Sequence, residues 1–404
     1  MNTQTTKILI LGGGFAGVMA ALRLAGKTRK EQVQITLVSA SDQLVERTRM
    51  HQLATGQQLK SYPIPHLLRK TGVQFVCGKV TALQPNQHCV TIEQVDGQKQ
   101  LEYDKLVYAL GSFVDRASMP GAAENAFTLD LASAEQLRTQ LPEIAQRNGR
   151  VVVIGAGLTG LEVVTEVAES YPTLQVSLLC GGTLGRDFAP KAVDYVHTVL
   201  RKRSISLHEQ SKVTRIDPGM VDCADGSQVP FDLCIYCGGF AVSPLAREAG
   251  IAVNLQGQML LDGTLRSLSH PDIYGAGDAS TLAENVFNLR MACATALPMA
   301  AHVADSLAAE VKGHAPQPFR FGFTIRCVSL GRSEGFVQMV DAQDRPKPTV
   351  LTGRLGVWIK EFILRFVIGS IQLTRLWPDT YQWPRSIQAG EASKGLEWQF
   401  SNNR

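Results

Sequence analysis

The sequence is poor in three things that would each point to a particular class of protein. It holds 8 cysteines among 404 residues, which excludes a small scaffold held by disulfides and predicts reduced thiols. Lysine and arginine number 40 against 36 acidic residues, and this balance excludes the broad basic stripe of a nucleic-acid-binding domain. Every window of 18 residues contains a charge, so no membrane-spanning helix is expected. Residues 1–7 are polar and lack the apolar core of a secretory leader, which predicts a cytoplasmic location.

What the sequence does contain is an internal repeat. Residues 7–17 (KILILGGGFAG) reappear as residues 150–160 (RVVVIGAGLTG), 143 positions further along. In each copy a run of aliphatic residues is typical of a buried parallel strand, and a glycine-rich turn and a helical pattern follow it. Both copies then return to a second strand, at residues 34–38 and 175–179. This is the order of a βαβ nucleotide-binding unit, and it occurs twice.

The two copies also agree beyond the glycine turns. Each has a hairpin signal, Asp96-Gly97 or Asp225-Gly226, and then an apolar strand at residues 105–110 or 233–236. A length near 400 residues suggests two or three domains. We therefore predict an α/β fold with two Rossmann-like dinucleotide-binding domains.

The three glycines of each repeat have separate physical roles. The first allows a tight turn, the second lets backbone N–H groups approach a pyrophosphate, and the third packs the helix against the strand. The helix N-terminus adds partial positive charge. The predicted glycines are Gly12, Gly14 and Gly17 in the first repeat, and Gly155, Gly157 and Gly160 in the second.

Residues 270–280 (HPDIYGAGDAS) complete a set of motifs that resembles the FAD- and NAD(P)-dependent pyridine nucleotide oxidoreductases, over about residues 7–313. Within that superfamily the chain is most similar to type II NADH dehydrogenases. The resemblance implies an FAD-binding domain at residues 1–115 and 265–314, an inserted NAD(P)H-binding domain at 116–264, and a C-terminal α+β domain at 315–404. It also implies hydride transfer from NADH or NADPH to FAD. That step needs no protein acid or base, so neither a catalytic residue nor a metal site is expected.

The same resemblance implies roles for individual residues. Asp278 would bind the ribitol of FAD, and Val80, at the end of the strand before the first hairpin, would offer its backbone to adenine. Arg49, together with Arg47 and His51, would lie near the flavin. Pro298 would begin a helix whose N–H groups, from Leu297 and Met299, point at the flavin. The other expected cofactor contacts are Phe15, Ala16, Gly111 and Ser112 for FAD, and Leu158, Glu162, Gly238 and Gly239 for NAD(P)H.

Both repeats lack the acidic residue that usually binds ribose hydroxyls about 20 positions after the glycines. Ser39 stands there in the first repeat, where its hydroxyl can still bind a ribose. Cys180-Gly181 stands in the second, so no carboxylate repels the 2′-phosphate of NADPH. Arg186 is available to pair with that phosphate. We therefore expect NADPH to be accepted at least comparably to NADH.

The electron acceptor is the least specified part of the prediction. A quinone is the first expectation, although Ala296-Leu297 stands where type II NADH dehydrogenases carry Ala-Gln beside the quinone. Alternatives are a small ferredoxin-like carrier, or sulfide as donor to a quinone with Cys293 and Cys327 as the reactive thiols. An alternative from a different functional class is that the chain is a flavin-bound redox sensor or interaction protein. Cys234 and Cys237 lie three apart on one strand, point to opposite faces and are interpreted as packing residues.

The C-terminal residues have a different character. Residues 321–330 and 335–340 predict strands, and residues 354–371 predict a helix with Trp358 and Phe362 among its regularly spaced apolar positions. The first interpretation is a domain that covers the flavin or forms a homodimer; the second is a helix lying on a membrane surface. Residues 315–404 carry a net charge of +5 and the remainder −1. The basic character thus belongs to the part expected to meet an acceptor, a partner subunit or an anionic membrane.

Overall fold

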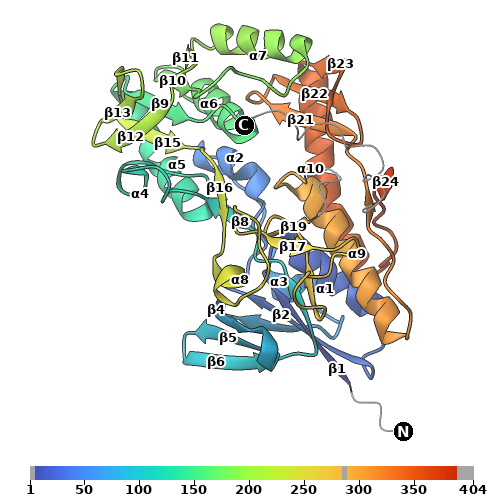
Figure 1. The fold of residues 1–404 in the computed structure, drawn as a ribbon. Helices are drawn as coiled ribbons and strands as arrows, with labels where there is room; N and C mark the ends of the chain where they lie inside the picture. The colour runs from blue at the N-terminus through green and yellow to red at the C-terminus, as the bar shows by residue number, and fades with distance from the viewer. Residues whose placement is uncertain (1–4, 284–288, 389–404) are drawn as a thin grey trace, which may run out of the picture.

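The computed structural model describes residues 5–283 and 289–388 (Figure 1). The first repeat forms a five-stranded parallel sheet, here called the first sheet, in the order β18-β7-β1-β2-β3. The second repeat forms a four-stranded parallel sheet, the second sheet, in the order β11-β10-β9-β15. The strands of the first sheet are β1 (Thr6–Leu11), β2 (Val33–Ser39), β3 (Gln74–Cys77), β7 (Lys105–Tyr108) and β18 (Ile273–Gly275). Those of the second are β9 (Arg150–Ile154), β10 (Gln175–Leu179), β11 (Ser206–His208) and β15 (Leu233–Tyr236).

The two sheets have the same register. Lys7 of β1 lies opposite Gln34 of β2, and Arg150 of β9 lies opposite Gln175 of β10, so equivalent residues pair in both repeats. The chain leaves the first sheet after β7, builds the second, and returns for β18. The predicted α/β class with two Rossmann-like units is confirmed.

Helices cover the first sheet closely because their facing residues are small. α1 (Phe15–Lys27) packs along α9 (Cys293–Val311), and most alanines of both helices are buried. The antiparallel strands β4 (Lys79–Gln84), β5 (Cys89–Gln94) and β6 (Gly97–Glu102) form a meander beside this sheet. The predicted hairpin at Asp96-Gly97 lies between β5 and β6.

The second sheet has its own helices and meander. The helices are α5 (Leu131–Gln146), α6 (Leu158–Ser170) and α7 (Pro190–Lys202), and the meander is β12 (Val213–Asp217), β13 (Met220–Cys223) and β14 (Gln228–Pro230). A two-stranded ribbon connects the repeats: β8 (Ser112–Val114) pairs antiparallel with β16 (Phe240–Val242).

The C-terminal part is divided between the two cores. The antiparallel sheet β21 (Ile325–Ser329), β22 (Gly335–Val340) and β23 (Pro346–Thr352), here called the C-terminal sheet, packs against α6 and α7 of the second repeat. The helix α10 (Arg354–Thr374) runs from this sheet towards α1 of the first repeat (Figure 1). Phe336 accordingly belongs to the core of the second sheet, whereas Ile371 belongs to that of the first.

The apolar face of α10 is exposed, and the opposite face of the helix is buried. Trp358 is 79% exposed and Phe362 is 70% exposed, whereas Lys360 is only 6% exposed. The apolar face of α10 is therefore open to a second subunit or to a membrane surface, and the covering of the flavin by the C-terminal part stays a prediction. Within the described residues no helix has both the length and the apolarity to cross a bilayer.

The remaining elements are short connections. They are η1 (Arg47–Arg49), α2 (Met50–Ala54), α3 (Ile64–Leu67), η2 (Pro85–Gln87), α4 (Ala122–Asn125), α8 (Leu245–Glu248), the pair β17 (Met259–Leu261) and β19 (Ser280–Leu282), and the pair β20 (Arg320–Phe321) and β24 (Ile387–Gln388).

Candidate functional site: two glycine turns and a buried charged junction

The first glycine turn joins β1 to α1 and is open only at its middle glycine. Gly12 has a φ of +111°, and a Cβ there would lie 2.2 Å from the carbonyl oxygen of Ala109. A Cβ on Gly17 would lie 1.8 Å from the oxygen of Gly12, so helix and strand are in close contact. A Cβ on Gly14 would meet nothing within 4 Å, and no side chain caps the helix there. The N–H groups of the first turn, which starts at Phe15 and Ala16, are thus free for a pyrophosphate.

The second glycine turn repeats this geometry between β9 and α6. Gly155 has a φ of +103°, and a Cβ on Gly160 would lie 1.8 Å from the oxygen of Gly155. A Cβ on Gly157 would again meet nothing within 4 Å, and α6 begins at Leu158 without a side-chain cap. Both predicted cradles therefore fit the phosphates of a dinucleotide.

A polar group lies at the carboxyl edge of the first sheet, where ligands of parallel sheets bind. Ser112 donates its hydroxyl proton to Asp278 Oδ2 at 2.7 Å, and Arg47 Nη1 donates to the Ser112 carbonyl oxygen at 2.6 Å. Burial raises the pKa of Asp278, and Ser112 and Arg47 oppose that shift. Gly111, with a φ of +70°, makes the turn before Ser112. The structure thus brings Asp278, Gly111 and Ser112 together as predicted.

Arg49 does not belong to this group. Its Nη1 and Nη2 donate to the two carboxylate oxygens of Glu361 at 2.9 Å each, and its Nε donates to Glu46 at 3.1 Å. The guanidinium thus binds carboxylates on two sides and ties the first repeat to α10. The predicted contact of Arg49 with the flavin stays a prediction. Its ion pair with Glu361 could not be predicted, because the two residues lie over 300 positions apart.

Val80 and Ser39 lie near their expected places but in different settings. Val80 is the second residue of β4 and does not end a strand, because Gly78 separates β3 from β4. Ser39 ends β2 directly against the first glycine turn, and a Cβ on Gly13 would lie 2.4 Å from its Oγ. The Ser39 hydroxyl donates to the Ser41 carbonyl oxygen at 2.7 Å and accepts the Ser41 N–H at 3.3 Å, so one lone pair is left to accept from a ribose.

The helix α9 begins earlier than the sequence predicts. Its first residue is Cys293, so Pro298 lies inside the helix and does not begin it. Leu297 and Met299 are 2% and 1% exposed, and their N–H groups belong to the helix body. The free N–H groups at this N-terminus are those of Cys293 and Ala294. Alanines before Pro298 extend the helix backwards, and this outweighs the preference of proline for a first turn.

A buried charged cluster, here called the junction, joins the three parts of the chain. Lys360 of α10 contacts the carboxylate of Glu162 on α6 and donates to Ser329 Oγ at 2.9 Å. His51 of α2 has its Nδ1 3.8 Å from Glu162 Oε2 and is 2% exposed. Burial, and then the charge of Arg49, lowers the pKa of Lys360 to about 7. Burial, and then the positive charges of Lys360, Arg332 and Arg49, also lowers the pKa of His51.

The loop of residues 180–189, here called the 180–189 loop, follows β10 where a ribose is expected. Arg186 is exposed, and Gly181 leaves 3.8 Å between a would-be Cβ and the Cα of Lys212. A carboxylate that was not predicted lies here: Glu209, just after β11, accepts a hydrogen bond from the Leu184 N–H at 2.6 Å. The position of Glu209 could have been predicted, because β10 and β11 are parallel neighbours and end at the same edge of the second sheet.

Gly238 and Gly239 follow β15 and lie against the second glycine turn. A Cβ on Gly155 would lie 2.8 Å from the Cys237 carbonyl oxygen, and Gly239 has a φ of +48°. Cys234 and Cys237 are both free thiols, and burial raises the pKa of each. Cys237 lies just beyond β15, not on the strand as predicted, and is partly buried; protonated thiols agree with the predicted packing role.

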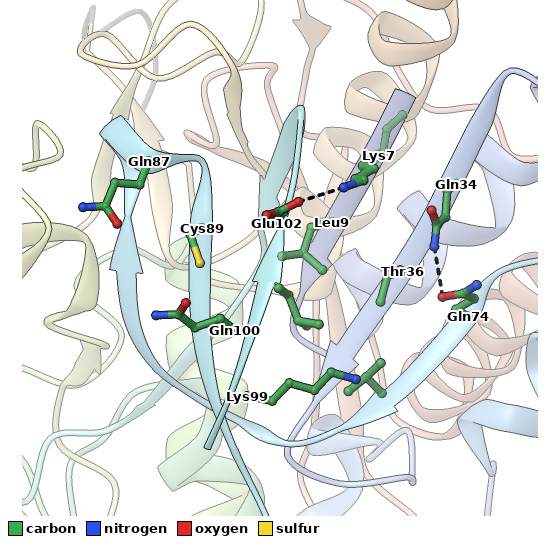
Figure 2. A pocket seen from close by; sticks show the side chains of 13 residues that line it. Lys7, Leu9, Gln34, Thr36, Gln74, Gln87, Cys89, Lys99, Gln100 and Glu102 are labelled. Carbon is green, nitrogen blue, oxygen red and sulfur yellow. Dashed lines mark hydrogen bonds and ion pairs between the residues drawn. The ribbon is translucent and has the colours of Figure 1, made fainter. Parts of the chain in front are cut away.

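A separate cavity of about 550 Å³ lies between the first sheet and the β4–β6 meander (Figure 2). It is lined by the starting halves of β1 and β2, including Lys7 and Thr36, whereas the glycine turn follows the other end of β1. Lys7 is paired with Glu102 at 2.9 Å, and Gln34 donates to Gln74 at 3.3 Å. This cavity is therefore distinct from the cofactor site.

Comparisons with known proteins agree with this geometry. The chain is 25% identical over 369 residues to an NADH dehydrogenase-like protein of Mycobacterium tuberculosis, with 85% of this chain and 92% of that protein covered. It is 23% identical over 395 residues to a type II NADH:quinone oxidoreductase of Staphylococcus epidermidis, with 90% and 95% covered. The solved sulfide:quinone oxidoreductase of Aquifex aeolicus superposes with a TM-score of 0.77 at 17% identity, over 96% of this chain and 99% of that one.

The same comparisons match residues 6–306, which include both glycine turns, Ser112 and Asp278, to the pyridine nucleotide-disulphide oxidoreductase family. The chain belongs to the pyridine nucleotide-disulphide oxidoreductase family and is an oxidoreductase.

Proposed function

We propose that the chain is an FAD-dependent NAD(P)H:quinone oxidoreductase. A flavin and a nicotinamide dinucleotide are the cofactors that go with the family and the relatives, and FAD is our specific assignment for the flavin. The observation that carries the proposal is the duplicated cradle: Gly14 and Gly157 are both open at the start of an uncapped helix. Two dinucleotide cradles in one chain suit the exchange of a hydride between two dinucleotides.

The residues of each cradle have defined tasks in this proposal. The helix starts at Phe15 and Leu158 supply N–H groups to the two pyrophosphates, and Asp278 with Ser112 holds a polyol hydroxyl. A bound flavin accepts a hydride from the nicotinamide and passes two electrons to an acceptor. Lys360 Nζ, with a pKa of about 7, is suited to give a proton to the reduced acceptor.

A quinone is favoured as acceptor by the surface of α10. Leu355, Trp358, Phe362 and Phe366 are 51–79% exposed and lie on one helical face, with Leu376 and Trp377 exposed just beyond the helix. Exposed apolar surface of this extent, beside Arg354 and Arg365, fits the interface of an anionic membrane. We propose peripheral membrane contact through α10, which places the enzyme where a lipid-soluble quinone is found. A homodimer through the same face is the competing proposal.

Both NADH and NADPH are proposed as donors. The end of β10 carries no carboxylate, Glu209 is engaged by the Leu184 N–H, and the exposed Arg186 has no ion-pair partner among the described residues. Steady-state rates with both nucleotides test this point. A kcat/KM for NADPH within tenfold of that for NADH agrees with the proposal, and one a hundredfold lower contradicts it.

The acceptor is tested by a panel. The purified protein is mixed with NADH and, in separate assays, with ubiquinone and menaquinone analogues, a ferredoxin and no acceptor. Fast turnover with a quinone alone supports the proposal. Turnover with the ferredoxin alone, or a long-lived reduced state with every acceptor, would reject it in favour of a carrier reductase or a redox sensor.

Sulfide:quinone reduction is a second candidate because the structure brings Cys293 and Cys327 into one environment. Both are partly exposed, and Arg290, three residues before Cys293, donates to the Ile325 carbonyl oxygen on the strand of Cys327 at 3.3 Å. However, burial and then the neighbouring Cys293 raise the pKa of Cys327 to about 12, which disfavours a reactive thiolate. Flavin reduction by sulfide that is lost in Cys327→Ser would favour this candidate, and no reduction by sulfide would remove it.

A further inference from the structure

We propose that Arg326 and Gln338 of the C-terminal sheet are positioning residues for the adenosine half of NAD(P)H, because they hold the 180–189 loop in place. This inference rests on the proposed function in one respect: it assumes that the 180–189 loop contacts a bound nicotinamide nucleotide. Neither Arg326 nor Gln338 belongs to a glycine turn.

The contacts form a clamp on three consecutive loop residues. Arg326 Nη1 donates to the Asp187 carbonyl oxygen at 2.7 Å, and Gln338 Oε1 accepts the Ala189 N–H at 2.7 Å. Between them, the ring of Phe188 lies under the Arg326 guanidinium, 5.9 Å from the guanidinium carbon to the ring centre. Every one of these loop groups is thus bound from the C-terminal sheet.

The clamp is built into the sheet register. Arg326 of β21 and Gln338 of β22 lie directly opposite each other, so both side chains stand on the same face of the sheet and reach the loop together. Phe336, two residues before Gln338 and on the same face, meets Phe188 edge to face with ring centres 5.2 Å apart. A single sheet face therefore supplies all the contacts.

These polar groups are buried at a cost, and Arg326 Nε and Gln338 Nε2 have no hydrogen-bond partner among the described residues. Gln338 is 0% exposed and Arg326 is 9% exposed. Arg326 Nη2 binds Asp344 Oδ2 at 2.9 Å, and Arg290 Nε lies 2.9 Å from the same oxygen. Apolar residues would pack this contact without the cost of burying charge. The directional bonds to Asp187 and Ala189 are what an apolar contact would not supply.

The clamp is expected to affect nucleotide binding, because the residues that it holds are adjacent to Arg186. The loop runs from the end of β10, where the adenosine ribose of a dinucleotide lies, to the start of α7. Fixing residues 187–189 therefore fixes Arg186 and limits the entropy that the loop loses when a nucleotide binds. Loss of the clamp is expected to weaken binding of the adenosine half without affecting the binding of the flavin.

The test uses ADP-ribose, which carries the adenosine half but no nicotinamide, in calorimetric titrations of the full-length flavoprotein. We expect Arg326→Gln and Gln338→Leu each to weaken ADP-ribose binding about tenfold and to raise the KM for NADH similarly. The kcat at saturating NADH and the flavin content are expected to stay within twofold of wild type. Gln338→Glu keeps an acceptor oxygen beside Arg326 and is expected to restore the affinity.

Lys202→Ala is the matched control. It removes a 2.8 Å ion pair with Glu334 that joins the same sheet to α7, away from the loop. Unchanged ADP-ribose affinity in Gln338→Leu, equal weakening in Lys202→Ala, no rescue by Gln338→Glu, or no ADP-ribose binding by the wild type would each overturn the inference. Binding of ADP-ribose by a wild-type protein whose flavin NADH fails to reduce would refute the proposed function and leave the inference standing.

Discussion

At the scale of single residues, the glycine turns depend on contacts close in the chain, whereas the charged junction joins residues that lie far apart in it. Gly12, Gly14 and Gly17 can be assigned from spacing because each role is local: a positive φ, an open approach and a close helix–strand contact. The partners of Arg49 and Glu162 are Glu361 and Lys360, which come from α10 near the other end of the chain. Only the folded arrangement brings such residues together, so charge pattern along the sequence cannot reveal them.

A comparison of two glycines in one turn gives a sharp prediction. Gly157→Ala adds a methyl group to open space at an extended φ of −69°, so the free energy of unfolding should change by less than about 0.5 kcal/mol. The methyl group would occupy the approach of the pyrophosphate, and KM for NADH should rise at least about tenfold, or ~1.4 kcal/mol. Gly155→Ala, at a φ of +103°, should instead destabilise the protein by about 1–3 kcal/mol. Chemical denaturation and steady-state kinetics measure both, and equal effects of the two substitutions would contradict the assignment.

Lys360 gives a prediction about pH. Its ammonium is lost as the pH rises through about 7, so quinol formation in the wild type should slow above that pH. Lys360→Met should be slow at every pH and lose this dependence. The low pKa also affects stability: between about 7 and the ordinary value of 10.5 the unfolded chain holds a proton that the folded chain does not. Stability from this residue therefore rises with pH across that window, and the full burial penalty is present below pH 7.

The control for this prediction removes the carboxylate as well. Lys360→Met alone leaves Glu162 buried without its cation, whereas Lys360→Met combined with Glu162→Gln leaves no unpaired charge. We expect the double variant to unfold at a higher temperature than the single one and to remain pH-independent in quinone reduction. A pH profile in Lys360→Met that matches the wild type would assign the titration to another group.

At the scale of elements, the position of α10 was predictable, whereas the start of α9 and the buried side of α10 were not. The spacing of apolar residues located α10 to within three residues at its C-terminal end, and its start at Arg354 agrees. The same spacing left open what the apolar side faces: Trp358 and Phe362 are exposed, and Gly356, Lys360 and Leu364 form the buried side. A hydrophobic stripe shows that a helix is amphipathic, and it does not show whether protein or lipid covers the stripe.

The exposed face of α10 predicts binding to lipid. Trp358→Ser combined with Phe362→Ser should leave stability and flavin reduction by NADH unchanged, because both side chains are mostly exposed. Binding to vesicles that contain phosphatidylglycerol should weaken at least about tenfold, by the loss of two apolar anchors. Leu255→Ser, at a residue that is 95% exposed and far from α10 in sequence, is the control and should bind as the wild type does. Co-sedimentation measures this, and full vesicle binding by the double variant would favour α10 as a protein interface.

At the scale of the whole molecule, the two repeats and their order follow from the sequence, whereas the place of the C-terminal residues does not. Equivalent strands pair in the same register in both sheets, as a duplicated motif requires. The C-terminal sheet shares its core with the second repeat through Phe336, and α10 shares its core with the first through Ile371. The tail thus contacts both repeats and carries the lysine of the junction.

The central claim is that hydride passes from a nicotinamide bound at the second repeat to a flavin bound at the first, and from there to a quinone. Anaerobic stopped-flow spectroscopy tests it most directly. The account predicts that NADH bleaches the flavin absorbance of the oxidised protein in one fast phase, and that a quinone analogue then restores it faster than the steady-state turnover. A protein purified without flavin, or a flavin that NADH does not reduce, would contradict the account.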